Sequence, residues 1–335
     1  MFTFTRVAGA ALGVLILSAT TLARADCKLL QIAEFKLDPK SYAPIVDGSI
    51  DGHPVKVLLD TGSDFSMITY YEAQKLGLPR VEAVGWRAYG IGGSTQLYWA
   101  HVGQLKIGDL TKAGIDLAVA GDRHEASDVA VVIGEDVLSK ADIEFDLAHN
   151  AIRMFEPKDC TAPQLVYWGA AYSQADVLPR ERDAPTLQAK AYLNGKQVVA
   201  ELDSGAETSL VDATTAAADG AVRSAAGAEP DAIHGSGPKP EQSWTGAFDS
   251  FAFGDEKIAH VKIQVANFKR DMSYTETGSN LPRHIDAGPS MFIGEDFLRA
   301  HRVYVDNQDH LILFSYQGGP VFATPKPEAT KAASK

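Results

Sequence analysis

The chain of 335 residues has few of the residues on which several classes of protein depend. It has two cysteines, and its nine histidines are scattered, without a His-Glu-x-x-His motif or the paired Cys/His spacing of a zinc site. We therefore expect no metal and no cofactor, and we interpret the histidines as surface residues. The formal net charge of −12 argues against nucleic acid or an anionic membrane surface as a partner.

Long apolar runs are also absent. A transmembrane helix needs about 20 apolar residues, and the longest candidate, Val7 to Leu17, is too short for an anchor. With Arg6 before it and Ala23-Arg24-Ala25 after it, this run is typical of a cleaved signal peptide over residues 1–25. We expect a periplasmic or secreted protein that has no membrane anchor after cleavage. Loss of the two arginines takes the formal charge to −14.

The two cysteines, Cys27 and Cys160, form an even pair. In the oxidising compartment that a signal peptide implies, such a pair favours a disulfide. It would tie the start of the mature chain to the end of its first half. Two free thiols remain the alternative.

Against this background, one motif occurs twice. "LLDTGSDFSMIT" (Leu58 to Thr69) places Asp-Thr-Gly directly after an apolar strand, and "ELDSGAETSLVD" (Glu201 to Asp212) places Asp-Ser-Gly in the same way. Either triplet alone is consistent with an ordinary β-turn. Downstream, however, "VVIGEDVL" (Val131 to Leu138) matches "MFIGEDFL" (Met291 to Leu298). The chain therefore reads as two tandem copies of one domain.

The repeat and the composition divide the chain. Four prolines mark the region between the copies, and the region from Thr324 onward is short, polar and rich in Pro, Ala and Lys. We predict a signal peptide (residues 1–25), an N-terminal lobe (26–156), a linker (157–185), a C-terminal lobe (186–323) and a disordered tail (324–335).

Each copy reads as an all-β lobe with short helices. Asp51-Gly52 and Asn194-Gly195 each precede their aspartate by nine residues and favour hairpins with type I′ turns. Tyr70 to Leu76 reads as a short helix closed by Gly77, and Glu135 to Lys140 as another. Trp86 to Ala100 reads as a hairpin with a glycine-rich tip, and Ile233 to Gly254 as its weaker counterpart.

Together these motifs resemble the retropepsin-like aspartic proteases. Asp-Thr/Ser-Gly after an apolar strand, a glycine-tipped hairpin and Ile-Gly before a short helix are all present twice. The resemblance implies two retropepsin- or pepsin-like acid-protease β-barrel lobes, related by pseudo-twofold symmetry within one chain. The sequence departs from the retroviral pattern, since Gly-Glu-Asp stands where those enzymes have Gly-Arg. It also lacks a long basic prosegment before Asp60.

By this resemblance the catalytic residues are Asp60 and Asp203. Two carboxylates about 3 Å apart share one proton, so one can deprotonate a water while the other polarises the scissile carbonyl. The supporting loop residues would be Thr61, Gly62 and Ser63 in the first lobe and Ser204, Gly205 and Ala206 in the second. The flaps over the substrate would contain Gly90, Ile91, Gly92 and Gly93, with Gly235 and Gly237 on the other side.

Other acidic and aromatic residues have competing interpretations. Asp136 and Asp296 could form a second carboxylate pair, but their positions at the starts of short helices favour dipole and capping roles. Asp146 and Asp306 read as structural. The aromatic residues near the first flap, such as Trp86 and Trp99, would form apolar subsites or pack in the core.

These residues lead to two functional hypotheses. The first is a monomeric aspartic endopeptidase that cleaves polypeptides at apolar residues. The alternative is a catalytically silent module that binds peptides in the same cleft. The presence of both Asp60 and Asp203 favours the enzyme, because a pure binder needs neither carboxylate.

Overall fold

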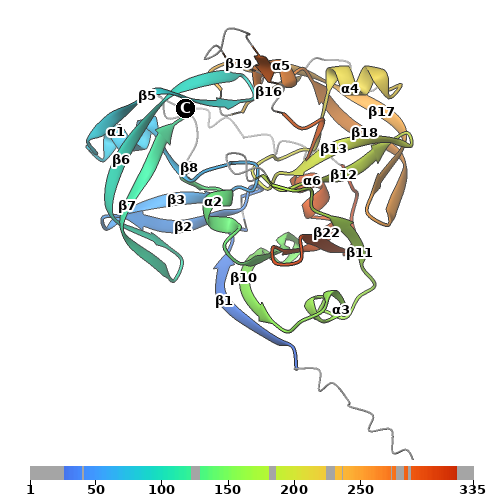
Figure 1. Cartoon of the computed structure of the whole chain (residues 1–335), viewed down its shortest axis with the longest axis horizontal. Coiled ribbons are helices and arrows are strands. Elements are labelled where there is room, and N and C mark those ends of the chain that lie inside the picture. The colour runs from blue at the N-terminus through green and yellow to red at the C-terminus, as the bar shows by residue number, and fades with distance from the viewer. Residues whose placement is uncertain are drawn as a thin grey trace, which may run out of the picture.

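The computed structural model describes residues 26–39, 41–121, 129–180, 186–223, 231–235, 237–272, 274–276, 283–285 and 288–322. The predicted signal peptide and the predicted tail lie outside these residues. Within them the protein is mostly β, and its two barrels lie side by side above a third sheet (Figure 1). No helix among the described residues is long and apolar enough to cross a membrane.

The first barrel is a closed ring of six strands. Pairing of Gly48 with Ile107 and of Ile50 with Leu105 joins the first and last strands of the ring. In ring order its strands are β2 (Ile45–Ile50), β3 (His53–Leu59), β8 (Val129–Ile133), β4 (Met67–Thr69), β7 (Leu110–Ala120) and β6 (Gly93–Ile107), and β5 (Arg80–Gly90) extends from β6 as the other arm of its hairpin.

The second barrel repeats this ring. Ala191 pairs with Phe253 to close it. The strands in ring order are β12 (Gln188–Leu193), β13 (Lys196–Leu202), β21 (Met291–Ile293), β14 (Leu210–Asp212), β18 (Glu256–Ala266) and β17 (Glu241–Phe253), while β15 (Val222–Arg223) and β16 (Asp231–Ile233) pair with β17 outside the ring. The expected fold, two tandem barrel lobes of the pepsin type, is therefore confirmed.

Short helices connect the strands. The helices are α1 (Tyr70–Lys75), α2 (Glu135–Leu138), α3 (Ala162–Leu165), α4 (Ala213–Ala218), α5 (Lys269–Met272) and α6 (Glu295–Leu298), with a 3-10 turn η1 (Leu147–His149) and a small hairpin of β19 (Tyr274–Glu276) and β20 (Arg283–Ile285). Helix α1 begins after Thr69, whose hydroxyl accepts a bond from the Glu72 amide, and Gly77 follows its end at φ +67°. Asp51-Gly52 and Asn194-Gly195 both have positive φ, as the predicted type I′ turns require.

A third sheet joins the lobes. Its six strands, in order, are β1 (Lys28–Lys36), β10 (Ala151–Lys158), β9 (Asp142–Asp146), β22 (His301–Asp306), β23 (Leu311–Tyr316) and β11 (Ser173–Asp176). Glu144 of β9 pairs with Tyr304 of β22, and each lies ten residues after the glycine of its Ile-Gly motif. The pseudo-twofold axis therefore passes between these two strands.

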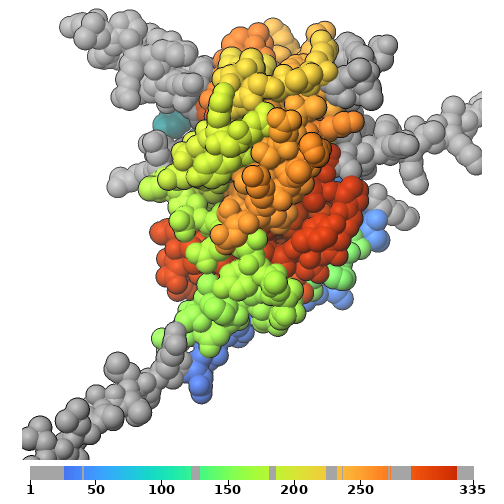
Figure 2. Space-filling model, turned by 90° about the vertical axis from the view of Figure 1, so that its right-hand side faces the viewer, coloured from blue at the N-terminus to red at the C-terminus, as the bar shows by residue number. Residues whose placement is uncertain are grey.

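The segment between the lobes also contributes to this sheet. Residues 157–185 were expected to form a linker, and within them β11 pairs with β23 through Ser173↔Phe314 and its neighbours. On the face in Figure 2, this green segment and the red C-terminal strands lie directly beneath the second barrel. The connection between the lobes is thus partly a strand of the sheet that unites them.

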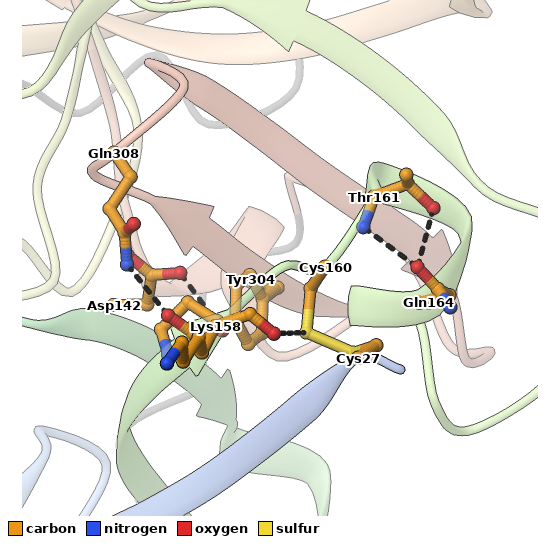
Figure 3. Close-up of a disulfide and its surroundings, with 9 residues drawn as sticks. Cys27, Asp142, Lys158, Cys160, Thr161, Gln164, Tyr304 and Gln308 are labelled. Carbon is orange, nitrogen blue, oxygen red and sulfur yellow. Dashed lines mark hydrogen bonds between the residues drawn. A yellow bond between two sulfur atoms is a disulfide. The ribbon is translucent and has the colours of Figure 1, made fainter. Parts of the chain in front are cut away.

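The two cysteines meet at one edge of the third sheet. Cys27, just before β1, and Cys160, just after β10, form a disulfide (Figure 3). Strands β1 and β10 pair antiparallel, from Lys28↔Lys158 at this end to Lys36↔Ala151 at the other. The bond therefore closes the open end of a pair of strands that already lie together.

One histidine, His301, is not at the surface, contrary to the interpretation from the sequence. His301 is fully buried, its ring stacks on Phe297 with centroids 4.0 Å apart, and its Nε2 lies 3.1 Å from Glu256. A flat ring with two polar atoms can fill a core position when both atoms have partners, as here. Among the described residues, no group of three or more His, Cys, Asp or Glu side chains is arranged to hold a metal ion.

Candidate active site

The two aspartate loops meet between the barrels. Strand β3 ends at Leu59 and β13 at Leu202, so Asp60 and Asp203 each follow a buried strand. The amide of Asp60 donates to the carbonyl of Ile133 at 2.9 Å, and that of Asp203 donates to the carbonyl of Ile293, also at 2.9 Å. The apolar strands and the Ile-Gly motifs together determine where each aspartate emerges.

Hydroxyl groups hold the two loops together across the lobes. Thr61 Oγ1 donates to the Leu202 carbonyl at 2.5 Å, and Ser204 Oγ donates to the Leu59 carbonyl at 2.8 Å. Each hydroxyl also accepts from the backbone amide of the other residue, at 3.0 and 3.1 Å. Thr61 and Ser204 are both fully buried. The four bonds are reciprocal, so they fix the loops in a nearly symmetric arrangement.

The carboxyl groups approach each other over the two glycines. A Cβ on Gly62 would lie 2.4 Å from Cγ of Asp203, and a Cβ on Gly205 would lie 2.5 Å from Cγ of Asp60. Only glycine leaves room for this approach. The amides of Gly62 and Gly205 each donate at 2.9 Å to the aspartate of their own loop.

Electrostatics favour one proton on this pair. Burial raises the pKa of Asp60, while a hydrogen bond with Asp203 and the amides of Gly62 and Gly205 oppose the rise. Burial also raises the pKa of Asp203 well above its usual value, and the charges of Asp60 and Glu201 add to the effect. Two carboxyls this close do not both ionise readily, so Asp60 and Asp203 titrate as a pair.

The residues after each aspartate have smaller roles. Ser63 Oγ donates to the Phe65 carbonyl at 3.0 Å. At the equivalent position, the amide of Ala206 donates to Asp203 at 3.0 Å. Both bonds therefore help to hold the shape of the loops.

A second layer of bonds supports each loop from behind. In the first lobe, Ser66 donates to Asp136 through its amide (2.8 Å) and its hydroxyl (2.7 Å), and it accepts from the Gly134 amide. In the second lobe, Ser209 and Asp296 make the same bonds at 2.9 and 2.6 Å, and Gly294 is the equivalent glycine. Asp136 and Asp296 are therefore loop supports.

The expected dipole and capping roles of these two aspartates hold in part, since both lie in the first turn of their helices and the amides of Asp296 and Phe297 bond to the Asp296 carboxylate. Gly134 and Gly294 are the N-caps of α2 and α6, and neither cap has a side-chain hydrogen bond. Each aspartate lies two residues after the N-cap glycine and turns its carboxylate toward the serine of the loop. Asp146 and Asp306 are structural, since Asp146 accepts from Arg153 at 3.1 Å and Asp306 accepts from the Gln308 amide at 3.0 Å.

The two predicted flap tips touch each other. The carbonyl of Ile91 accepts from the Gly237 amide at 2.9 Å, and that of Gly92 accepts from the Lys239 amide at 3.2 Å. A Cβ on Gly235 would lie 2.6 Å from Cβ of Ile91. The tip of the first-lobe hairpin, from Gly90 at the end of β5 to Gly93 at the start of β6, thus rests on the second lobe.

The side chain of Ile91 completes this contact. It packs with Ile233 and Met272 on a buried cluster of the second lobe, made by Leu210, Ala266, Phe268 and Phe292. Further back along the same hairpin, Trp86 is 69% exposed and Trp99 45% exposed. Core packing therefore does not account for these two indoles, whereas Tyr98 packs edge-on against Tyr70 at 5.6 Å.

Similarity to known proteins agrees with this geometry for the first lobe. Residues 46–140 match the family model of gag-polyprotein putative aspartyl proteases. This match supports a retropepsin-like aspartyl protease domain. It includes the loop of Asp60, the first flap and Gly134, whereas the second lobe lies outside the matched residues.

A curated relative matches over a similar length. The UBA domain-containing protein Mud1 of Schizosaccharomyces pombe is 31% identical over 115 residues, which cover 34% of this chain and 33% of the relative. The matched region thus spans about a third of that protein.

The sequence patterns missed several buried acids around the retropepsin-like loops. Glu201 is 3% exposed, and burial raises its pKa to about 8. Burial likewise raises the pKa of Glu135 to about 7 and that of Asp64 to about 6. A signal for Glu201 was available, since a carboxylate interrupts an apolar strand where the first copy has Leu58.

Proposed function

We propose that this protein is an aspartic endopeptidase that hydrolyses peptide bonds with a water activated between Asp60 and Asp203. The observation that carries the proposal is the close, proton-sharing approach of these two carboxyls over Gly62 and Gly205. The cross-lobe bonds of Thr61 and Ser204 support it, because a pair that must act together needs rigid loops.

The proposed reaction uses both protonation states of the pair. The ionised carboxyl removes a proton from the water as it attacks the scissile carbonyl carbon, and the protonated carboxyl gives its proton to the carbonyl oxygen. The resulting tetrahedral diol breaks down when a proton passes to the departing nitrogen. No metal and no covalent intermediate is needed in this mechanism.

The proposal includes the form of the protein and its substrates. One chain supplies both aspartates, so a monomer suffices. We infer that the substrate is a polypeptide with apolar residues near the scissile bond, because the exposed indoles of Trp86 and Trp99 offer apolar contacts on the first flap hairpin. Export to the periplasm or the medium remains our proposal for its location.

A denatured protein substrate tests the activity. The purified chain is incubated with it from about pH 3 to pH 7, with and without a statine-type inhibitor. We expect fragments that the inhibitor suppresses, with a bell-shaped pH profile, because the pair must hold one proton. If no inhibitor-sensitive fragments form at any of these pH values, the catalytically silent peptide-binding module is the better account.

A further inference from the structure

The glutamates of the two Gly-Glu-Asp motifs are buried, and each lies against an arginine from outside its motif. Glu295 accepts from Nε of Arg299 at 3.1 Å. Glu135 lies 3.4 Å from Nη2 of Arg180, which belongs to the segment between the lobes. The sequence has Gly-Glu-Asp where retroviral enzymes have Gly-Arg, and each motif thus receives its arginine from elsewhere in the chain.

Arg299 also reaches across to the first lobe. It is the C-cap residue of α6, which lies near the centre of the molecule (Figure 1). Its Nη2 donates to the backbone carbonyl of Tyr42 and, at 3.4 Å, to that of Ser41. The guanidinium also lies over the Tyr42 ring, 4.4 Å from the centroid. Such a combination of an ion pair, forked donors and stacking is specific to arginine, because a lysine ammonium has neither the fork nor the flat face.

The residues that Arg299 holds lead directly to the loop of Asp60. The carbonyl of Pro44, two residues after Tyr42, accepts from the amide of Leu59 at 3.2 Å. Leu59 is the last residue of β3 and immediately precedes Asp60. The position of this first-lobe strand end therefore depends on a side chain of the second lobe.

At its other end Arg299 is connected to the loop of Asp203. The amide of Glu295, whose side chain holds Arg299, donates to the carbonyl of Ala206 at 2.9 Å. The amide of Ala206 in turn donates to the carboxylate of Asp203 at 3.0 Å. A short chain of hydrogen bonds thus runs from the loop of one aspartate, through Arg299, to the strand that carries the other.

The first lobe has no equivalent of this connection. Ser139 occupies the position equivalent to Arg299, and its hydroxyl donates to the carbonyl of Glu135 in its own lobe. Arg180 approaches Glu135 without a hydrogen bond and donates to Oδ1 of Asn307 at 2.9 Å, just after β22. These contacts lead to the third sheet rather than to the end of β13. Arg299 therefore makes a one-sided connection in an otherwise nearly symmetric site.

We propose that Arg299 is a positioning residue that sets the separation of the Asp60 and Asp203 carboxyls, by connecting the strand of the first to the loop of the second. The inference rests on the proposed function and deepens it, because two carboxyls share one proton only at short range. The action of Arg299 passes through the backbone on both sides, and it exchanges no proton with the substrate.

The first test is the width of the pH profile of kcat/KM for cleavage of a denatured protein by the full chain. Two close carboxyls lose their protons at well-separated pH values, and a larger distance brings the two pKa values together. Arg299→Lys keeps the charge but loses the forked donors. We expect its acid limb to move to higher pH and its alkaline limb to lower pH, so that the bell narrows by about one unit.

Arg299→Gln, which removes the charge, should narrow the bell in the same way. Loss of a nearby positive charge without a change in geometry would instead move both limbs toward higher pH, because each carboxylate would be less stabilised. An unchanged width in both variants, or such a parallel shift in Arg299→Gln with no change in Arg299→Lys, would overturn the inference.

Arg153→Gln is the matched control. Arg153 is also largely buried, and it pairs with Glu144 at 2.6 Å and with Asp146 at 3.1 Å, but these partners belong to its own copy of the repeat. This variant should melt at a lower temperature and keep the width of the bell. A purely structural role for Arg299 predicts the same pair of results for Arg299→Lys, which would contradict the proposal.

Hydrogen exchange provides a second measurement, which does not depend on activity. The amide of Leu59 and its equivalent in the second lobe, that of Leu202, donate to the carbonyls of Pro44 and Leu187. Only the first of these two bonds lies next to residues that Arg299 holds. In Arg299→Lys we expect the Leu59 amide to exchange at least about fivefold faster, while the Leu202 amide keeps its rate. Equal acceleration of both amides would indicate a general loss of stability and would count against the proposal.

Failure of the inference and failure of the proposed function are distinguishable. An unaltered protein without inhibitor-sensitive activity would refute the proposed function, and the exchange of the Leu59 amide would still decide whether Arg299 holds the end of β3. An active protein whose Arg299→Lys variant keeps both the width of the bell and the exchange rate of Leu59 would refute the inference alone.

Discussion

The two glycines of the aspartate loops are the most constrained single residues of the site. Gly62 and Gly205 each lie against the carboxyl of the opposite lobe, in contacts that a Cβ would bring well under 3 Å. The carboxyl group in each contact belongs to the proposed dyad. An added methyl group would displace this carboxyl group, and the proposed reaction depends on its position. We therefore expect a methyl group at either glycine to lower the activity more than the stability.

For Gly62→Ala we expect kcat/KM to fall by at least about 100-fold, because a displacement of about 1 Å at the reacting groups has effects of this size. Gly77→Ala is the control, since Gly77 has φ +67° with nothing within 4 Å of its added Cβ. That variant should lose about 1 kcal/mol of stability through backbone strain and keep its activity. Thermal melts of both variants measure the change in stability, and their cleavage rates measure the change in activity. A fully active Gly62→Ala would contradict the geometry.

Residue types explain what the sequence could and could not predict at this scale. The meeting of Asp60 and Asp203 over their glycines was predictable, because the same short motif follows an apolar strand twice and resembles that of a two-lobed aspartic protease. The role of Asp136 was not, because its partner Ser66 is 70 residues away in the sequence and only the fold brings them together. The buried position of His301 was missed for the same reason, because its hydrogen-bond partner Glu256 lies on another strand.

At the scale of elements, the first flap hairpin contacts both lobes. It belongs to the first barrel through β6, and its tip bonds to Gly237 and Lys239 of the second lobe. Helix α5 of the second lobe also contacts β5 and β6. In the proposed reaction, the tip therefore has to separate from the second lobe, or bend, before a polypeptide reaches the aspartates.

We expect Gly92→Ala to weaken this contact. A Cβ at Gly92 would lie 2.0 Å from the Lys239 carbonyl oxygen, and its φ of +90° is unfavourable for alanine. The amide of Gly237 should then exchange hydrogen faster, and KM should change more than the melting temperature. Gly85→Ala is a matched control on the same hairpin, in strand β5, with φ +82° and open space around the added Cβ. Equal exchange rates in the two variants would show that the tips do not hold each other.

The disulfide closes one end of the β1–β10 pair. It spans 133 residues of sequence, so its loss releases a long loop in the unfolded chain. We expect the double variant Cys27→Ser, Cys160→Ser to melt a few degrees lower and to keep its kinetic constants, because the bond lies at the edge of the third sheet. Calorimetry of both proteins under non-reducing conditions checks this. An unchanged melting temperature would mean that strand pairing alone holds β1.

Local signals were sufficient for the short elements. Helix α1, with Thr69 before it and Gly77 after it, and the hairpin turns at Asp51-Gly52 and Asn194-Gly195 follow from cap and turn chemistry. The pairing of β11 with β23 did not follow, because four residues among several prolines carry no strand signal of their own. That strand forms because the edge of β23 offers it unpaired backbone groups.

At the scale of the whole molecule, buried carboxyl groups link stability to pH. Burial is the main cause that raises the pKa of Glu135 to about 7, of Glu201 to about 8 and of Glu295 to about 9, from an ordinary value of 4.5. Between these values and 4.5 the folded protein binds more protons than the unfolded chain. The free energy of unfolding must therefore fall as the pH rises through this window.

We thus expect the melting temperature to be higher near pH 5 than near pH 8, in buffers of equal ionic strength. Glu295→Gln should reduce this dependence, since glutamine carries no proton to lose. Differential scanning calorimetry at both pH values measures the difference. A melting temperature that rises from pH 5 to pH 8 would show that these carboxyls are ionised in the folded protein.

The pseudo-twofold arrangement places one aspartate from each lobe at the axis, and both lobes belong to one chain. The central claim is that Asp60 and Asp203 of the same chain form one dyad. The most direct measurement is the cleavage of a denatured protein by Asp60→Asn, by Asp203→Asn and by a mixture of the two refolded together. We predict that each variant loses at least about 100-fold in rate and that the mixture regains nothing. Near-normal activity in either single variant, or recovery in the mixture, would contradict a dyad built within one chain.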